Sequence, residues 1–235
     1  MSNDPTIHLI HVPGMTGYTI KDARFVRTFN ESDRIVAEGF DWPERWYMFL
    51  KNLRDRQQHG FAAEQLCDLV QSKRAAHPDD AIVLTGHSTG TLIILESLTQ
   101  LPVGVVTQAW LLAAAVSPRF DLCDALAHTD RMVSVCSYGD LHLSVGTPIG
   151  GTADGRHQFG AGCVGFRGPG SDASNFEQWR YRPSWIKHGY LGEHITVLAT
   201  RFARNVITPS ILGFQSDRAS DESGLERGSQ ASCPD

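Results

Sequence analysis

The sequence predicts an α/β protein: a single-domain, doubly wound and mostly parallel sheet of about six strands with helices on both faces. Short apolar runs alternate with longer amphipathic segments from about residue 6 to about residue 210. This alternation is typical of parallel strands that are connected by helices. The chain has 235 residues, of which 41% are hydrophobic, so it is long enough for one large core. We therefore expect one domain over residues 1–213, with a ligand site at the carboxyl ends of the strands.

The first half of the chain contains the clearest strand and helix patterns. The β-prone run at 6–12 stops at Pro13, and a second run at 34–40 stops just before Pro43. A continuous apolar run at 81–85 is typical of a strand that is buried on both faces. The expected strands are 6–12, 34–40 and 81–85, and the expected helices are 61–76 and 91–101.

The second half continues the alternation but is less regular. The expected strands are 109–116, 132–137 and a last short strand at 163–167, and the expected helices are 122–127 and 193–207. Residues 141–170 are rich in glycine and are interpreted as a surface loop. Residues 214–235 are rich in Ser, Asp, Glu and Gly and are expected to form a disordered tail.

Charge and composition exclude several classes of protein. The formal net charge is -5 and no Lys/Arg run exceeds two residues, so we expect no nucleic-acid partner. No apolar run approaches the ~18 residues of a membrane span, and the first residues do not resemble an export signal. Five cysteines without C-x-x-C spacing fit a reducing compartment. We expect a cytoplasmic protein without a cofactor, and the oligomeric state stays open.

A serine flanked by glycines lies where the strand 81–85 meets the helix 91–101, in the motif Gly86-His87-Ser88-Thr89-Gly90. A sharp turn from strand to helix places this serine at positive φ, and only very small residues fit two positions before and after it. The pattern by itself is short enough to occur by chance. Its position between a buried strand and a helix indicates that Ser88 is a nucleophile.

At this point the chain resembles the α/β-hydrolase family of esterases and lipases, over residues 6 to about 210. His11-Val12-Pro13-Gly14-Met15 is similar to the family's oxyanion loop, although Val12-Pro13 separates a His and a Gly that are adjacent in the family. The resemblance implies a compact, six-stranded version of the fold without the family's two leading antiparallel strands. It also implies that the backbone N–H groups of Met15 and Thr89 form the oxyanion hole.

A serine nucleophile needs a histidine base and a carboxylate that orients the histidine. The family order is serine, acid, histidine. Asp140 follows the expected strand 132–137 and is the predicted acid, with Asp121 and Asp154 as weaker candidates.

The predicted base is His194, at the start of the expected helix 193–207. His188 is the alternative, but it lies next to Gly189, and a helix start holds a side chain better than a flexible loop does. With Ser88 and Asp140, His194 completes a predicted triad that acts on a small-molecule carboxylic ester through an acyl-enzyme.

Aromatic residues suggest where a substrate binds. Trp42 and Trp46 follow the carboxyl end of an expected strand, so we assign them to a lid or to the wall of an acyl pocket. The sequence leaves open whether residues 42–60 or 141–170 form a lid. It also leaves open the size of the substrate, whether the bond that is cleaved is an ester, a thioester or an amide, and whether the protein is a hydrolase or an acyltransferase.

Two other functions remain as alternatives. A hydrolase-fold binding protein without activity would not need all three triad residues in order. Gly160-Ala161-Gly162-Cys163-Val164-Gly165 matches a dinucleotide-binding pattern, but the residues after it cannot open a helix that holds a pyrophosphate. Asp140 with His142, and Asp154 with His157, are isolated pairs without a Cys/His cluster, so no metal site is predicted.

Overall fold

The structure, a computed structural model, describes residues 5–42 and 53–229, with only the backbone described for 219–229. Six strands form one sheet in the order β2-β1-β3-β4-β5-β6, and every neighbouring pair is parallel. The predicted α/β fold class is confirmed. The strands are β1 Ile7–Val12, β2 Ile35–Gly39, β3 Ala81–His87, β4 Val106–Leu112, β5 Thr129–Cys136 and β6 Phe176–Arg180.

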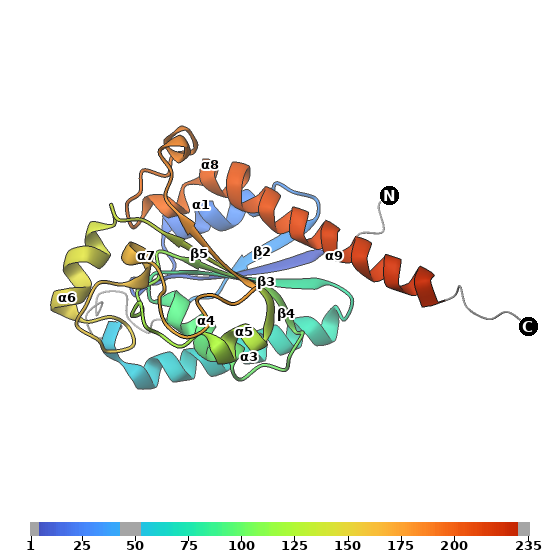
Figure 1. Cartoon of the computed structure of the whole chain (residues 1–235), viewed down its shortest axis with the longest axis horizontal. Helices are drawn as coiled ribbons and strands as arrows, with labels where there is room; N and C mark the ends of the chain where they lie inside the picture. Colours follow the sequence, from blue (N-terminus) through green and yellow to red (C-terminus); the bar gives the residue numbers. More distant parts are fainter. Residues whose placement is uncertain (1–4, 43–52, 230–235) are drawn as a thin grey trace, which may run out of the picture.

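Helices cover both faces of this sheet. Figure 1 shows α1 and α9 over one face and α3, α4 and α5 over the other, with α6 at the end of the molecule away from both termini. The helices are α1 Ile20–Phe29, α3 Arg56–Ala76, α4 Gly90–Leu98, α5 Cys123–Ala127, α6 Thr147–Gly150, α7 Ala161–Val164, α8 Thr200–Phe202 and α9 Thr208–Ser229. None of the described helices is long and apolar enough to cross a membrane.

Each face has its own apolar core. Leu66 of α3 and Leu92 of α4 belong to one cluster of buried residues, and Phe25 of α1 and Phe202 of α8 belong to the other. The residues of β3 alternate between the two clusters, as Leu84 and Val83 do. The central strands are therefore buried on both faces, which explains their continuous apolar runs.

Helix α1 was not predicted from the sequence. A capping box starts it: the Oγ1 of Thr19 accepts a hydrogen bond from the N–H of Asp22, and the Asp22 carboxylate accepts one from the N–H of Thr19. Its inner face then buries Phe25 and Phe29. The Thr-x-x-Asp spacing before these phenylalanines was the available signal, although the box usually carries Glu or Gln.

The prediction of a last strand at 163–167 is wrong, because that segment starts within the short helix α7. A Cβ on Gly162 would lie 2.3 Å from the carbonyl carbon of Ala113, so α7 packs directly on this backbone. The sixth strand is β6, Phe176–Arg180, at the edge of the sheet. Its Phe-Glu-Gln-Trp-Arg sequence lacks a continuous apolar run, since an edge strand is only partly covered.

The prediction of one continuous helix over 193–207 is also wrong. A 3₁₀ turn spans Thr196–Leu198, and the helical region begins only at α8. Ala199 separates the two because its backbone is extended, with φ -61° and ψ 130°. Leu198 and Phe202 are still buried, so the apolar spacing correctly indicated which residues are buried but not that one helix spans them.

Within the expected tail, the described residues 214–229 are helical. Helix α9 runs from Thr208 to Ser229, and the expected boundary at residue 213 lies inside it. The buried side chain of Gln215 donates a hydrogen bond to the Oγ1 of Thr107, and Arg218 forms an ion pair with Asp130. These contacts hold the start of this polar segment against the sheet, although its composition alone predicted a solvent-exposed tail.

Candidate active site

Ser88 lies in a sharp turn between β3 and α4, with a φ of 53°. A Cβ on Gly86 would lie 3.0 Å from the carbonyl oxygen of Gly90. A Cβ on Gly90 would lie 2.4 Å from the carbonyl oxygen of Val12. The two glycines of the motif are therefore sterically required, and the positive φ expected for Ser88 is present.

The loop after β1 passes over this serine. A Cβ on Gly14 would lie 3.1 Å from the Cβ of Ser88, so the chain at Gly14 and Met15 adjoins the elbow. Thr89 is the N-cap of α4, and the first N–H groups of a helix have no acceptor within the helix. Met15 and Thr89 thus lie on the two segments that meet at Ser88.

Asp140 and His194 form a buried pair although 54 positions separate them in the sequence. The Nδ1 of His194 lies 2.8 Å from the Oδ2 of Asp140, and Asp140 is 1% exposed. The other carboxylate oxygen of Asp140 accepts a hydrogen bond from the N–H of Leu143 at 3.0 Å. Because the carboxylate accepts from Nδ1–H, the neutral ring keeps its lone pair on Nε2, the atom that a general base uses.

Ser88 and His194 line the same cavity, which has a volume of about 400 Å³. Its remaining lining is mostly apolar: Met15, Leu53, Ala115, Leu141, His142, Leu143, Val145, Gly146, Thr147 and Gly150. Several of these residues belong to the segment after β5 that was expected to be a surface loop. That segment forms a π-helical turn at His142–Gly146 followed by α6, and so supplies one wall of the cavity.

The alternative acids and the alternative base lie elsewhere. Asp121 accepts a hydrogen bond from the N–H of Cys123, and Asp154 accepts one from the N–H of Ser117. Both aspartates line a separate cavity. His188 contacts the side-chain amide of Asn205 and lines another groove. The structure therefore places His194 in the same cavity as Ser88 and Asp140 against His194, whereas these other residues lie elsewhere.

Two further histidines lie beside His194, and neither was assigned a role next to the base from the sequence. The ring of His142 stacks on that of His194 with a centroid distance of 5.1 Å, and the ring of His87 lies 4.8 Å away. Burial, together with the neighbouring His194, lowers the pKa of His87 to about 3, so His87 is neutral at physiological pH. No sequence pattern marks either residue for this position.

His11 begins the predicted oxyanion loop but its side chain points to a different network. Its Nε2 donates to the carboxylate of Asp22 at 3.0 Å, and its Nδ1 lies 2.9 Å from the hydroxyl oxygen of Thr85. Burial raises the pKa of Asp22, but hydrogen bonds from His11 and Thr19 outweigh this effect and lower it to about 2. The network connects β1, β3 and α1 near the end of β1, which leads into the loop that carries Gly14.

The structure corrects the assignment of Trp42 to the substrate-binding wall. Trp42 is 6% exposed and belongs to the apolar core, and its indole N–H donates to the carbonyl oxygen of Pro13 at 2.8 Å. Its hydrogen bond therefore supports the loop before Met15, and its ring packs in the core as buried aromatics usually do. Trp46 lies outside the described residues.

The Gly160–Gly165 pattern has a packing role. As expected from the sequence, residues 166–170 form no helix, and the four-residue α7 lies inside the motif itself. Gly162 allows the close approach to Ala113 described above, and Gly165 ends the helix with a φ of 84°. The glycines thus allow the backbone of α7 to pack closely against the segment after β4.

Comparison with known proteins agrees with this architecture. Residues 19–126 match a family described as alpha/beta hydrolase of unknown function (DUF900). A putative dienelactone hydrolase from Klebsiella pneumoniae superposes with a TM-score of 0.53 at 11% identity, covering 93% of this chain and 88% of that one. XC6422 from Xanthomonas campestris, described as an a/b serine hydrolase without lid, has a TM-score of 0.55 at 12% identity, covering 91% and 85%. No curated protein sequence matches the chain. The chain has the α/β-hydrolase fold.

Proposed function

We propose that this protein is a serine hydrolase that cleaves carboxylic esters through an acyl-enzyme. One observation carries the proposal: Ser88, held at positive φ in a strand-to-helix elbow, opens into the same cavity as His194, whose Nδ1 is bound to the buried Asp140. A serine, a histidine and a carboxylate in this chain order are the groups that acyl transfer requires.

Each residue has a defined step in this reaction. The Oγ of Ser88 attacks the ester carbonyl while the Nε2 of His194 takes its proton, and Asp140 holds the imidazole in the required tautomer. The N–H groups of Met15 and Thr89 stabilise the oxyanion, and one such donor contributes about 3–4 kcal/mol to transition-state binding. His194 then protonates the departing alcohol, and a water activated by the same base releases the acid and restores Ser88.

The lining of the cavity favours an apolar acyl group. Leu53, Leu143 and Val145 face a volume of about 400 Å³, with no Lys or Arg among the described lining residues. A charged acyl chain would lose its hydration there without gaining an ion pair. We therefore expect short to medium aliphatic esters to be preferred to dicarboxylate monoesters of similar length.

A labelling experiment with matched variants tests the proposal. Wild-type protein should react with a fluorophosphonate probe and hydrolyse p-nitrophenyl esters, and Ser88→Ala should lose both while keeping its circular dichroism spectrum. Ser144→Ala, which removes a partly exposed hydroxyl near the cavity, is the control and should keep both. Labelling that persists in Ser88→Ala would reject Ser88 as the nucleophile. Ester binding without turnover or labelling in wild type would favour the inactive binding protein.

A further inference from the structure

A cluster of two imidazoles and one carboxylate lies at the opposite end of the strands from Ser88. His8 belongs to β1, His77 caps the end of α3, and Asp80 directly precedes β3. Ser88 follows the carboxyl end of β3, whereas this cluster lies at its amino end, so a whole strand separates the two. The cluster is therefore independent of the proposed catalytic residues.

The three side chains each hold one potential ligand atom close to the other two, and the rings of His8 and His77 stack with a centroid distance of 4.3 Å. The Nε2 of His8 lies 3.0 Å from the Oδ2 of Asp80, and the Nδ1 of His77 lies 3.6 Å from the same oxygen. All three atoms lie within 4.8 Å of one another. Ligands about 2.0–2.1 Å from a tetrahedral Zn²⁺ are about 3.4 Å apart, close to the separations seen here. Rotation of the exposed His77 ring out of its stack on His8 would direct both nitrogens at one ion.

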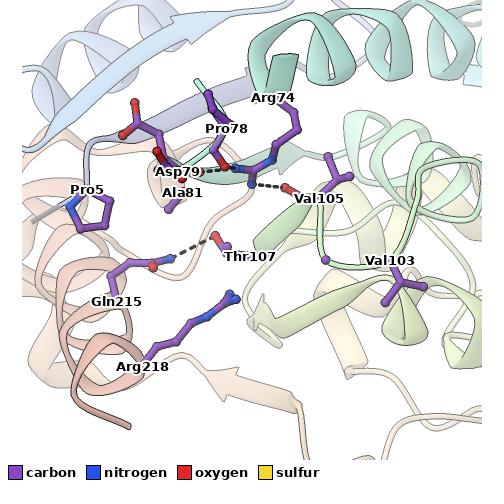
Figure 2. Close-up of a pocket in the computed structure, with 12 residues that line it drawn as sticks. Pro5, Arg74, Pro78, Asp79, Ala81, Val103, Val105, Thr107, Gln215 and Arg218 are labelled. Carbon is purple, nitrogen blue, oxygen red and sulfur yellow. Dashed lines mark hydrogen bonds between the residues drawn. The ribbon is translucent and has the colours of Figure 1, made fainter. Parts of the chain in front are cut away.

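Backbone contacts hold the carboxylate and its turn in place. The Oδ1 of Asp80 accepts a hydrogen bond from the N–H of Thr6 at 3.0 Å, which leaves Oδ2 directed at the two rings. Arg74 donates to the main-chain carbonyl oxygens of Pro78 and Asp80, each at 2.7 Å. Figure 2 shows the Arg74 guanidinium reaching this turn and also Val105. Because Arg74 is engaged by carbonyl groups, it fixes the turn between His77 and Asp80.

The cluster is buried on one side and open on the other. The side chain of His8 is 8% exposed, whereas that of His77 is 46% exposed. A hollow of about 380 Å³ adjoins Asp80 and is lined also by Pro78 and Asp79. The buried Nδ1 of His8 has no hydrogen-bond partner within the described part of the chain. This atom points away from the ligand atom Nε2, so it fits an ordered water and is not part of the ion site.

We propose that His8, His77 and Asp80 bind a divalent transition ion of the Zn²⁺ class, with water completing the coordination. Two imidazole ligands favour such an ion over Mg²⁺ or Ca²⁺, which prefer oxygen ligands. The ion would bridge β1 and the turn between α3 and β3, so its effect is on stability and not on ester cleavage. The sequence predicted no metal because these ligands come from segments about seventy residues apart and show no metal-binding spacing.

The test uses the full chain without a histidine tag, freed of metal with a chelator. Calorimetric titration should show one Zn²⁺ per chain, and Co²⁺ should give the absorption of a site with nitrogen ligands. Zn²⁺ should also raise the Tm, since a ligand that binds only the folded state stabilises it. His77→Gln should abolish both effects, and because His77 is largely exposed this variant should fold. His157→Gln, which removes an exposed histidine elsewhere, is the matched control and should bind as wild type does.

Several outcomes would overturn the proposal. Equal binding by wild type and His77→Gln, or no saturable binding by wild type, would leave the cluster as a hydrogen-bond network only. Loss of binding in His142→Gln instead would place the ion in the cavity beside His194. Mg²⁺ competing as well as Zn²⁺ would contradict the chemistry of the ligands. Ser88→Ala should bind Zn²⁺ normally, so failure of the esterase proposal would not affect this result.

Discussion

The side chain of His87 donates a hydrogen bond from Nε2 to the main-chain carbonyl oxygen of His194, over 3.0 Å. This bond joins the residue directly before Ser88 to the residue proposed as its base. The two residues are not paired by regular secondary structure, because His87 ends β3 and His194 lies in an irregular segment. The relationship indicates that His87 is a positioning residue, one that sets where the imidazole of His194 lies.

Replacing His87 should therefore slow turnover without weakening substrate binding. His87→Phe removes the donor, and a hydrogen bond of about 0.5–1.5 kcal/mol corresponds to a two- to tenfold loss in kcat. His87→Gln keeps an N–H donor of similar reach and should recover most of the rate. Steady-state kinetics with a p-nitrophenyl ester separate kcat from KM. Equal losses in the two variants would show that ring packing, not the hydrogen bond, matters.

Asp140→Asn should keep substrate binding but slow turnover by up to about 10⁴-fold, because an amide cannot hold the imidazole in the tautomer that accepts the serine proton. Asp121→Asn and Asp154→Asn are the controls, since each of these aspartates bonds a backbone N–H outside the cavity. The measurement is kcat/KM for the same ester. A larger loss in either control would contradict the assignment of the acid.

His194→Ala should abolish acylation, because no other described imidazole is bound to a buried carboxylate within this cavity. His188→Ala should retain acylation, since His188 faces a different groove. The burst of nitrophenolate in the first turnover reports acylation directly. The opposite ranking of the two variants would move the base to His188.

Gly90→Ala should destabilise the fold strongly. Its Cβ would lie 2.4 Å from the carbonyl oxygen of Val12, and backbone cannot move away cheaply at a packed elbow. Overpacking of this kind costs about 1–3 kcal/mol or more. Gly60→Ala, inside α3, is the matched control. No atom of the described residues lies within 4 Å of its added Cβ, so it should be neutral or stabilise by up to about 1 kcal/mol. Urea denaturation measures the free energy of unfolding of both variants.

Asp22 should make folding stability depend on acidic pH. Its pKa falls from 3.8 to about 2 in the folded state, so its contribution is present above about pH 4 and is lost as the pH falls towards 2. A shift of this size corresponds to about 2 kcal/mol. Asp22→Asn should lower the stability at pH 7 and flatten its dependence between pH 4 and 2, as measured by urea denaturation.

Asp33→Asn, at an exposed position before β2, is the control for that measurement and should leave the dependence unchanged. An Asp22→Asn variant whose stability still fell as steeply between pH 4 and 2 would show that other carboxylates dominate acid unfolding.

The sequence by itself determined the features that depend on neighbouring residues. Alternating apolar runs required parallel strands with helical connections, and Gly86 and Gly90 around Ser88 required a sharp elbow, because both constraints act within a few residues. Asp140 could be chosen as well, since the end of a strand in a parallel sheet faces the same edge as Ser88. These inferences needed no knowledge of distant contacts.

Only the tertiary structure decided how the distant residues meet. His194 was selected for a helix start that does not exist; it is held instead by Asp140 and by His87, from two other segments of the chain. Trp42 was predicted to line the substrate pocket but lies in the core, because its packing also depends on contacts with distant segments. His8, His77 and Asp80 converge because β1 and β3 are neighbours in the sheet. Contacts between segments far apart in sequence depend on strand order and loop packing, which local periodicity does not encode.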